Sequence, residues 1–302
     1  VLSSDGTDIS WAAAVAATDI DGLSDALSNS GGKTIGIGVS ALANDDGSDN
    51  YNTALGFQAG EDLTSGAGNT FVGGKAGEEA TTANYTVGIG YETIASVGVL
   101  TGHYNIGIGR FPGQDLTSGA HNTLMGYRAG GNATTANYTV AIGINAIGLG
   151  VLTGSENIAI GHEAGYDLTT GTYNHFIGHE AGSSVTSGHN NVFVGQNAGL
   201  NATTAPYNIA IGYVAIGLGV LTGTDNTAIG RGAGHDLTTG TYNVFQGYRA
   251  GFNATTGIEN VAIGKLAIGF GVLTGVNNIA IGRRAGYDLT TGSYNVILGY
   301  YG

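Results

Sequence analysis

The sequence predicts an all-β fold, a β-solenoid or β-roll built from coils of about 17 residues. Three observations predict it: one five-residue phrase recurs from residue 34 to the end, its spacing is nearly constant, and the composition is unlike that of an average globular protein, with 57 Gly, 2 Pro and no Cys. A period of this length is too short for a pair of helices. It fits a solenoid in which each coil adds one strand to a growing sheet.

The recurring phrase reads Asn, a β-branched residue, Ala or Phe, Ile or Val, and Gly. Its closing glycine, called here the repeat glycine, occurs sixteen times at intervals of 17 to 19 residues: Gly38, Gly56, Gly73, Gly90, Gly109, Gly126, Gly143, Gly161, Gly178, Gly195, Gly212, Gly230, Gly247, Gly264, Gly282 and Gly299. We therefore expect about 16 stacked coils over residues 34–302. At about 4.8 Å per stacked strand they would form a rod of roughly 75 Å.

The three residues before each repeat glycine are expected to form a strand. The first and third of them are mostly aliphatic, with Gln246 an exception in the third position, and alternate residues of a strand share a face, so these two are predicted to point into the coil. The middle residue is never charged and is then predicted to face outward and pack against sister chains. Its bulky members are Phe71, Leu124, Phe176, Phe193, Phe245 and Ile297.

Two ladders of polar side chains are expected along the stack. The first position of the phrase is Thr34, Thr86 or Thr139 in three coils and Asn in the other thirteen, where stacked amides can bond along the rod: Asn52, Asn69, Asn105, Asn122, Asn157, Asn174, Asn191, Asn208, Asn226, Asn243, Asn260, Asn278 and Asn295. Thr-Thr or Thr-Ser pairs eight residues after the repeat glycine predict a second ladder: Thr64, Thr117, Thr134, Thr169, Thr186, Thr203, Thr238, Thr255 and Thr290.

A longer rhythm of three coils, about 52 residues, runs through the second halves of the coils, which alternate among DLTTG, NATTA and GLGVLTG. One additional coil, with SSVTSG at 183–188, interrupts it. The GLGVLTG coils carry Ile in place of the Gly four residues after the repeat glycine, at Ile94, Ile147, Ile216 and Ile268. The rhythm predicts alternating bulky and small contacts between chains.

Residues 1–33 do not follow the repeat and are predicted to be an N-terminal connector. A turn or hairpin is expected around Asp5–Gly6, and Ile20, Leu23, Ala26 and Leu27 have helix-like spacing. The chain ends inside the repeated phrase, so further coils or a tip domain are expected after it.

Charge and composition narrow the possible partners. Nine Lys+Arg against 22 Asp+Glu give a formal net charge of −13, which disfavours a nucleic-acid partner. Without cysteine, disulfides and thiolate metal sites are excluded. Because no apolar run reaches the roughly 20 residues of a membrane-spanning helix, membrane insertion is not expected.

Few residues suggest chemistry. Asp45, Asp46 and Asp49 cluster oxygen ligands for Ca²⁺, but they lack the spacing and terminal Glu of an EF-hand loop, so a solvated turn is favoured. His162–Glu163 and His179–Glu180 lie one coil apart and should stack, more as a surface ladder than as a metal or proton-sensitive pair. No catalytic residue and no cofactor are predicted, and the chain is not expected to be an enzyme.

Aromatic and basic residues follow several repeat glycines, at Tyr127–Arg128, Tyr248–Arg249 and Arg283–Arg284. Ring faces and guanidinium groups of this kind can line a glycan-binding groove. They are equally compatible with plain decoration of the rod surface.

The phrase Asn-Ile-Ala-Ile-Gly at 157–161, 208–212 and 278–282, followed by Ala-Gly, resembles the head repeats of trimeric autotransporter adhesins. It is more similar still to Gly-rich repeats of bacteriophage tail fibres, particularly those of marine phages and cyanophages, and the opening VLSSDGTDISW at 1–11 is similar to a connector phrase of such fibres. The adhesin heads have shorter coils than this chain. The resemblance implies a homotrimer, surface exposure and attachment to a host, without catalysis.

Together the residues and the resemblance lead to a structural protein as the expected function. The first hypothesis is a tail-fibre shaft in the virion that supports host attachment, with other fibre or virion proteins and host-surface glycan as partners. The alternatives are a bacterial surface adhesin head or an extracellular filament subunit. An ice-binding solenoid that uses the threonine rows is a remote third, because neighbouring threonines of a pair point to opposite sides.

Overall fold

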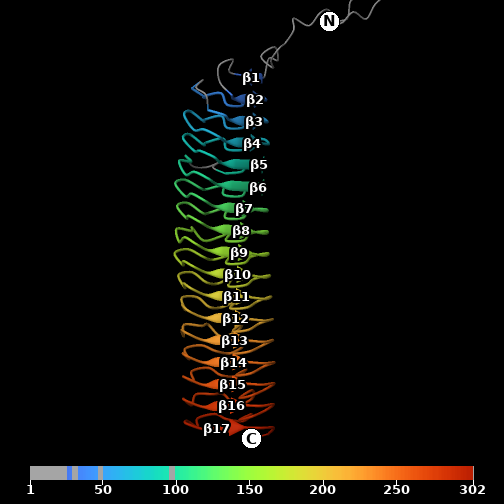
Figure 1. Ribbon diagram of the computed structural model, residues 1–302, viewed down its shortest axis with the longest axis vertical. Helices are drawn as coiled ribbons and strands as arrows, with labels where there is room; N and C mark the ends of the chain where they lie inside the picture. The colour runs from blue at the N-terminus through green and yellow to red at the C-terminus, as the bar shows by residue number, and fades with distance from the viewer. Residues whose placement is uncertain (1–25, 29–32, 47–49, 95–98, 302) are drawn as a thin grey trace, which may run out of the picture.

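The structure, a computed structural model, describes residues 26–28, 33–46, 50–94 and 99–301. Over these residues it is all-β and contains no helix, and hence none that could cross a membrane. Sixteen parallel strands, β2 to β17, stack about 17 residues apart into a β-solenoid of about 15 turns, which forms a straight column (Figure 1). The predicted fold class is confirmed. The hairpin expected around Asp5 lies outside the described residues.

The strands are short, and each of the sixteen includes the three residues before a repeat glycine. Their bounds are β1 Ala26–Ser28, β2 Ile35–Ile37, β3 Thr53–Leu55, β4 Thr70–Val72, β5 Val87–Tyr91, β6 Ile106–Arg110, β7 Thr123–Met125, β8 Val140–Ile142, β9 Ile158–Ile160, β10 His175–Ile177, β11 Val192–Val194, β12 Ile209–Ile211, β13 Thr227–Ile229, β14 Val244–Gln246, β15 Val261–Ile263, β16 Ile279–Ile281 and β17 Val296–Leu298.

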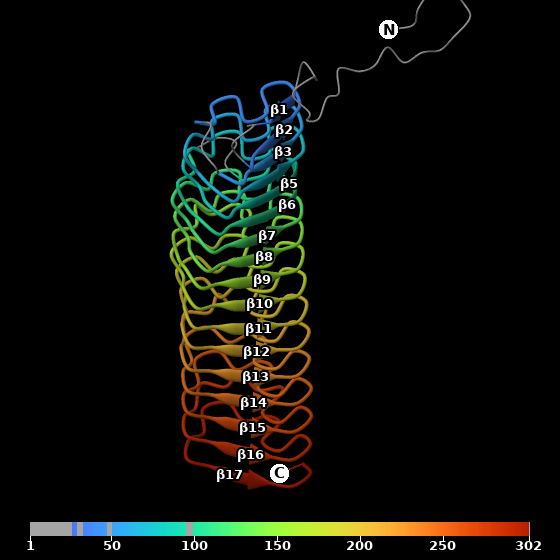
Figure 2. The ribbon, with the colours of Figure 1, turned by 45° about the horizontal axis from the view of Figure 1, so that its top comes forward.

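Every coil repeats the same register. Phe176 of β10, for example, pairs with Ala159 of β9 on one side and with Phe193 of β11 on the other. Between strands, the turns of one coil also bond to the turns of the next, and the strands lie above one another on one side of the column (Figure 2). The backbone of each coil is therefore the template for its neighbour.

At the start of the column, β1 pairs antiparallel with β2, so that Leu27 is opposite Gly36. The helix-like spacing of Ala26 and Leu27 thus gave the wrong prediction. The outer edge of β2 presents unpaired backbone groups, and pairing with that edge favours an extended segment over a helix.

The inward face of the strands is the opposite of the predicted one. The middle residue is buried in every strand from β2 to β16: Phe176 has no exposed surface, whereas its neighbour Ile177 is 41% exposed. The reason is that alternate residues of a strand share a face, and the middle residue Phe176 lies two positions after the buried Asn174. Because all three strand positions are mostly apolar, hydropathy does not show which face of the strand is buried. The buried Asn ladder shows it.

The three-coil rhythm is a rule for filling the core. Coils with Phe in the middle of the strand carry Gly four residues after the repeat glycine, as in Phe176 with Gly182, and a methyl group on Gly182 would meet the Phe176 ring at 2.7 Å. Where the strand has Ala141, the same later position is the buried Ile147. Large and small residues therefore alternate inside one chain. The GLGVLTG coils also expose apolar side chains such as Leu149 and Val151, so contacts between chains at this rhythm stay a prediction.

The predicted asparagine ladder is present and buried. Between Asn157 and Asn295, every Asn of the ladder after the first donates its side-chain amide or its backbone N–H to the side-chain oxygen of the preceding Asn. Asn191 Nδ2, for example, donates to Asn174 Oδ1 at 3.1 Å. Two shorter runs, Asn52–Asn69 and Asn105–Asn122, end at Thr86 and Thr139. The threonine ladder is also present in part, since hydroxyl groups such as that of Thr169 donate to a backbone carbonyl one coil later.

Replacing Asn191 by Leu is expected to destabilise the solenoid by about 2–3 kcal/mol, because the Ala205 carbonyl and the Asn208 N–H would lose their buried partners. Asn191→Thr should lower the stability less, since Thr86 and Thr139 already occupy this buried position of the ladder. Urea unfolding followed by circular dichroism measures both variants. Equal stability of the Leu variant and the parent chain would show that the ladder contributes nothing.

Candidate interaction surface

The outward face of the stacked strands, called here the sheet face, consists of two files of side chains. The files are the first and third residues before each repeat glycine, and 26 of their 32 positions are aliphatic or Met. The six others are Thr53, Thr70, Thr123, His175, Thr227 and Gln246. Leu55 is 48% exposed near one end of the column and Ile281 is 41% exposed near the other. The face is thus apolar and open to solvent along its whole length.

The sheet face is larger than an ordinary exposed patch. Sixteen strands at about 4.8 Å make it about 70 Å long, and three residues make it about 10 Å wide, on the order of 700 Å². Single soluble chains seldom expose a contiguous apolar patch beyond about 300–600 Å². None of its 32 positions holds Asp, Glu, Lys or Arg, although the chain carries 31 of these residues. A surface of this kind is normally covered.

The residues predicted to pack between chains lie elsewhere. Five of them, Phe71, Leu124, Phe176, Phe193 and Phe245, are fully buried in their own coils, and Ile297 is partly buried against the same core. They cannot contact a sister chain, so that prediction is corrected. The premise of that prediction, that the strands are apolar on both faces, holds. The exposed apolar residues are the first and third of each strand, which flank the buried middle residue.

Aromatic side chains border the sheet face on the side where each strand begins. Tyr85, Tyr104, His121 and Tyr138 lie immediately before the ladder position in four consecutive coils, and their rings stack with centroids 4.8–5.1 Å apart. All four have a left-handed backbone, with φ between 52° and 60°. The stack extends the apolar surface beyond the two files.

One hollow interrupts this border. It measures about 480 Å³ and is lined by Tyr138, Val140, Glu156, Ile158, Tyr173 and His175. Glu156 is one of several non-aromatic residues at this position, with Gly68, Asn190, Asp225, Glu259 and Asn277. Hydrogen bonding to the Glu156 carboxylate raises the pKa of the Tyr173 hydroxyl, which strengthens its retention of a proton at neutral pH.

The candidate metal ligands do not converge in the part of the chain that is described. Asp45 and Asp46 accept hydrogen bonds from Asn52 and Asn50, and Asp49 lies outside the described residues. His162 and His179 stack at 5.0 Å as expected, each 3.8–3.9 Å from the adjacent glutamate. Over the described residues no group of three His, Asp or Glu side chains is placed to hold a metal ion.

Most threonine pairs expose one side chain, and only Thr64–Ser65 and Thr290–Thr291 expose both among the described pairs. The first hydroxyl of a pair, such as that of Thr186, bonds to the backbone of the next coil, while the second residue is exposed. The exposed residues form a single file: Ser65, Thr82, Thr101, Ser118, Thr135, Thr153, Thr170, Ser187, Thr204, Thr222, Thr239, Thr256, Thr274 and Thr291. A single file is not the flat two-dimensional array that the ice-binding hypothesis requires.

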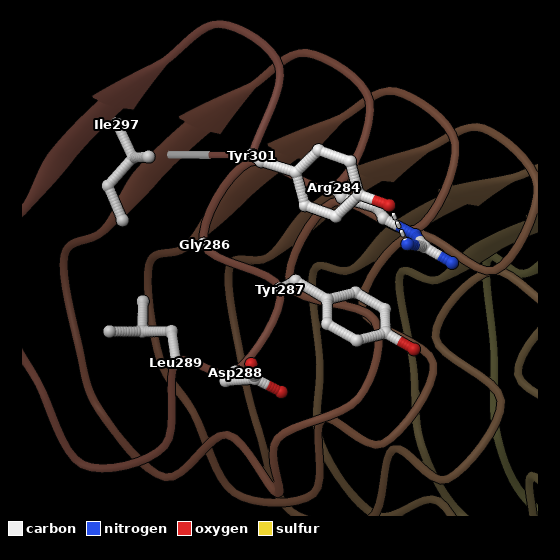
Figure 3. Close-up of a pocket in the computed structure, with 7 residues that line it drawn as sticks. All are labelled: Arg284, Gly286, Tyr287, Asp288, Leu289, Ile297 and Tyr301. Carbon is white, nitrogen blue, oxygen red and sulfur yellow. Dashed lines mark hydrogen bonds between the residues drawn. The ribbon is translucent and has the colours of Figure 1, made fainter.

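A further hollow, about 620 Å³, lies at the last coil (Figure 3). Its lining residues are Arg284, Gly286, Tyr287, Asp288, Leu289, Ile297 and Tyr301, and the Arg284 guanidinium is hydrogen-bonded to the Tyr301 hydroxyl. Within the described residues β17 pairs with β16 alone. The hollow thus lies beside the last described strand, and its lining includes Ile297, which packs against the core.

Basic or aromatic side chains occupy at least one of the first two positions after most repeat glycines. The exceptions are Val39–Ser40, Ile144–Asn145 and Gln196–Asn197, and three coils carry Glu92, Glu163 or Glu180 there. Arg110 lies over the rings of Tyr91 and Phe111 at 5.9 and 4.6 Å, and Arg128 lies over Tyr127 at 5.7 Å. Burial raises the pKa of the nearby Asp115 carboxyl, and the charge of Arg128 opposes that rise. The sequence indicated this surface through its Tyr-Arg pairs, but not which rings the arginines contact.

Comparison of the sequence with protein-family models finds no matching family, and comparison with curated proteins finds no match.

Proposed function

We propose that this chain is the shaft of an extracellular or virion fibre, in which three copies pack their sheet faces around a common axis. The observation that carries the proposal is the sheet face, a mainly apolar strip without Asp, Glu, Lys or Arg that runs along the column. A shaft needs length and stiffness, and a stack in which every coil bonds to the next supplies both.

A second copy of the chain is the occupant that fits the sheet face. Two copies share the same spacing of coils, so the ridges of one can settle beside the ridges of the other at each coil of the rod. The strip of about 700 Å² per chain approaches the roughly 800 Å² per partner of a standard stable interface. A globular partner would cover only a fraction of its length.

Three chains are proposed because the resemblance of the repeats to those of trimeric adhesins implies a homotrimer, and one such face per chain is compatible with it. Around a threefold axis, every chain turns its strip toward the centre and the assembly closes with the charged and polar surfaces outside. This arrangement keeps all chains parallel, which suits a fibre that carries an attachment function at one end. The proposed partners are thus two further copies and the fibre or virion proteins that the rod joins, and the proposed location is the virion or the cell exterior.

The mass of the purified chain in solution tests the proposal. Light scattering after size exclusion should give three times the 30.2 kDa of one chain, and electron micrographs should show straight rods. A monomer at micromolar concentration would contradict the assembly altogether. A two-chain mass would contradict the threefold arrangement.

A further inference from the structure

The positive charges of this acidic chain are concentrated. Eight of the nine Lys and Arg residues occupy the first two positions after a repeat glycine: Lys75, Arg110, Arg128, Arg231, Arg249, Lys265, Arg283 and Arg284. Five of them fall in residues 206–302, together with four acidic residues, whereas residues 1–205 hold four basic and 18 acidic residues. The last coils are thus the one long segment without a negative excess.

Most of these eight side chains rest on aromatic rings instead of pairing with acidic groups. Among the eight, Lys75 alone forms an ion pair with a described residue, Glu78, at 2.9 Å. Arg231 instead lies between the rings of Tyr213 and Tyr248, at 5.6 and 5.8 Å from their centroids. Its guanidinium is held in place while its charge stays uncompensated.

A second layer repeats the arrangement beside the first. Arg249 lies over the Phe252 ring at 4.7 Å and over the Tyr248 ring at 5.4 Å. The Phe252 ring also stacks on the His235 ring, with the centroids 4.3 Å apart. Cations and rings therefore alternate in two neighbouring files, and each ring in them has a neighbour on its face.

A hollow of about 300 Å³ lies between these layers. Gly232, which has no side chain, is among the residues that line it. The lining also includes Tyr213, Arg231, His235, Arg249 and Phe252. Arg231 and Arg249 are both exposed. The groove thus presents two guanidinium groups from consecutive coils, with a phenol and an imidazole beside them.

We propose that this groove binds an acidic polysaccharide, through a carboxylate or sulfate group held by Arg231 and Arg249. A planar guanidinium donates paired hydrogen bonds to such groups, and charge-assisted bonds of this kind are the stronger ones. The Tyr213 hydroxyl and Nε2 of His235 are further polar groups for sugar hydroxyl groups, whereas Nδ1 of His235 is bonded to the Asp236 carboxylate at 2.6 Å. Stacking has already restricted the arginine side chains, which lowers the entropy lost on binding.

A sugar chain fits better than a nucleic acid. Proteins that hold single strands offer open aromatic faces on which bases stack. Here Tyr248 has cations over its ring, Arg231 at 5.8 Å and Lys265 at 5.6 Å, and Phe252 is enclosed by Arg249 and His235. The groove offers hydrogen-bonding edges instead of free faces.

Calorimetric titration of the full chain tests the proposal, with an oligomer of galacturonic acid as the acidic probe. A glucose oligomer of equal length is the neutral probe, and oligothymidylate is the nucleic-acid probe. The galacturonate oligomer should bind, more weakly as salt rises, and the glucose oligomer should not. The double variant Arg231→Gln with Arg249→Gln should lose affinity by about tenfold or more, as expected when charge-assisted bonds are removed.

Arg110→Gln with Arg128→Gln is the matched control, because these residues occupy the same two positions in consecutive coils. It should change affinity by less than about twofold, since Arg128 has Asp115 nearby. Failure to bind galacturonate, equal losses in both variants, or binding of oligothymidylate as tight as that of galacturonate would overturn the proposal. These outcomes do not depend on the number of chains in the rod, which the mass measurement tests separately.

Discussion

Replacing Ile160 and Ile177 together by Lys is expected to break the rod into single chains. Both residues are in the third strand position of consecutive coils, and both point out of the sheet face. In a threefold assembly six ammonium groups would meet near the axis, where no acidic residue of the face can pair with them. Each unpaired buried charge costs several kcal/mol, which exceeds the stabilisation that burial of the two isoleucine side chains gives the assembly.

The fold of each chain should survive this change, because Ile177 is exposed on its own solenoid and contributes little to its core. Circular dichroism should therefore match that of the parent chain while the mass falls to that of one chain. Thr170→Lys with Ser187→Lys is the matched control: these two residues lie in the same two coils, on the exposed Ser/Thr file. A control that dissociates equally, or a face variant that keeps the three-chain mass, would exclude the sheet face as the interface.

The fold was predictable from the sequence because the repeat glycines record the length of each coil. The spacing of Gly161 and Gly178, for example, is the distance along the chain from β9 to β10. The asparagine ladder followed from the same alignment, since residues at one position of a solenoid repeat must stack. Coil length can be predicted even from a low-complexity sequence, because a constant spacing of the repeat glycines fixes the length of every coil.

The candidate surface could be predicted only in part. An apolar residue at all three strand positions, as in Val192-Phe193-Val194, leaves the inward face undecided by hydropathy. The fully buried Asn191, two residues before Phe193, decides it, but only once its burial is known. The groove at Gly232 was harder still, because it depends on which rings and cations stack across coils that are 17 or 18 residues apart in sequence.

Gly73→Ala is expected to lower the free energy of unfolding of the solenoid by about 4 kcal/mol. The repeat glycine has φ of 129°, a conformation that residues with a side chain rarely adopt, and strain of this kind costs about 1–3 kcal/mol. The added methyl would also overlap the carbonyl oxygen of Gly90 in the next coil. That carbonyl belongs to the stacked backbone and cannot move without loosening the coil, so overpacking adds a similar cost.

Gly74→Ala is the control, one residue later. Gly74 has no left-handed backbone, and the new methyl would make an ordinary contact, 3.4 Å from the Tyr91 ring. Its stability should lie within about 1 kcal/mol of the parent chain, with a small gain from the stiffer unfolded chain. Urea unfolding followed by circular dichroism compares the two variants directly.

The position of the damage is a sharper measure than its size. Coils of a solenoid contact only their neighbours, so a defect at Gly73 weakens the coupling of β4 to β5 and leaves distant coils intact. Hydrogen exchange should therefore accelerate in β3 to β6 and stay slow in β10 to β14 of the Gly73→Ala chain. Uniform acceleration along the column would mean that the coils unfold as one unit, and unchanged exchange near β4 would mean that the repeat glycines are not required for stacking.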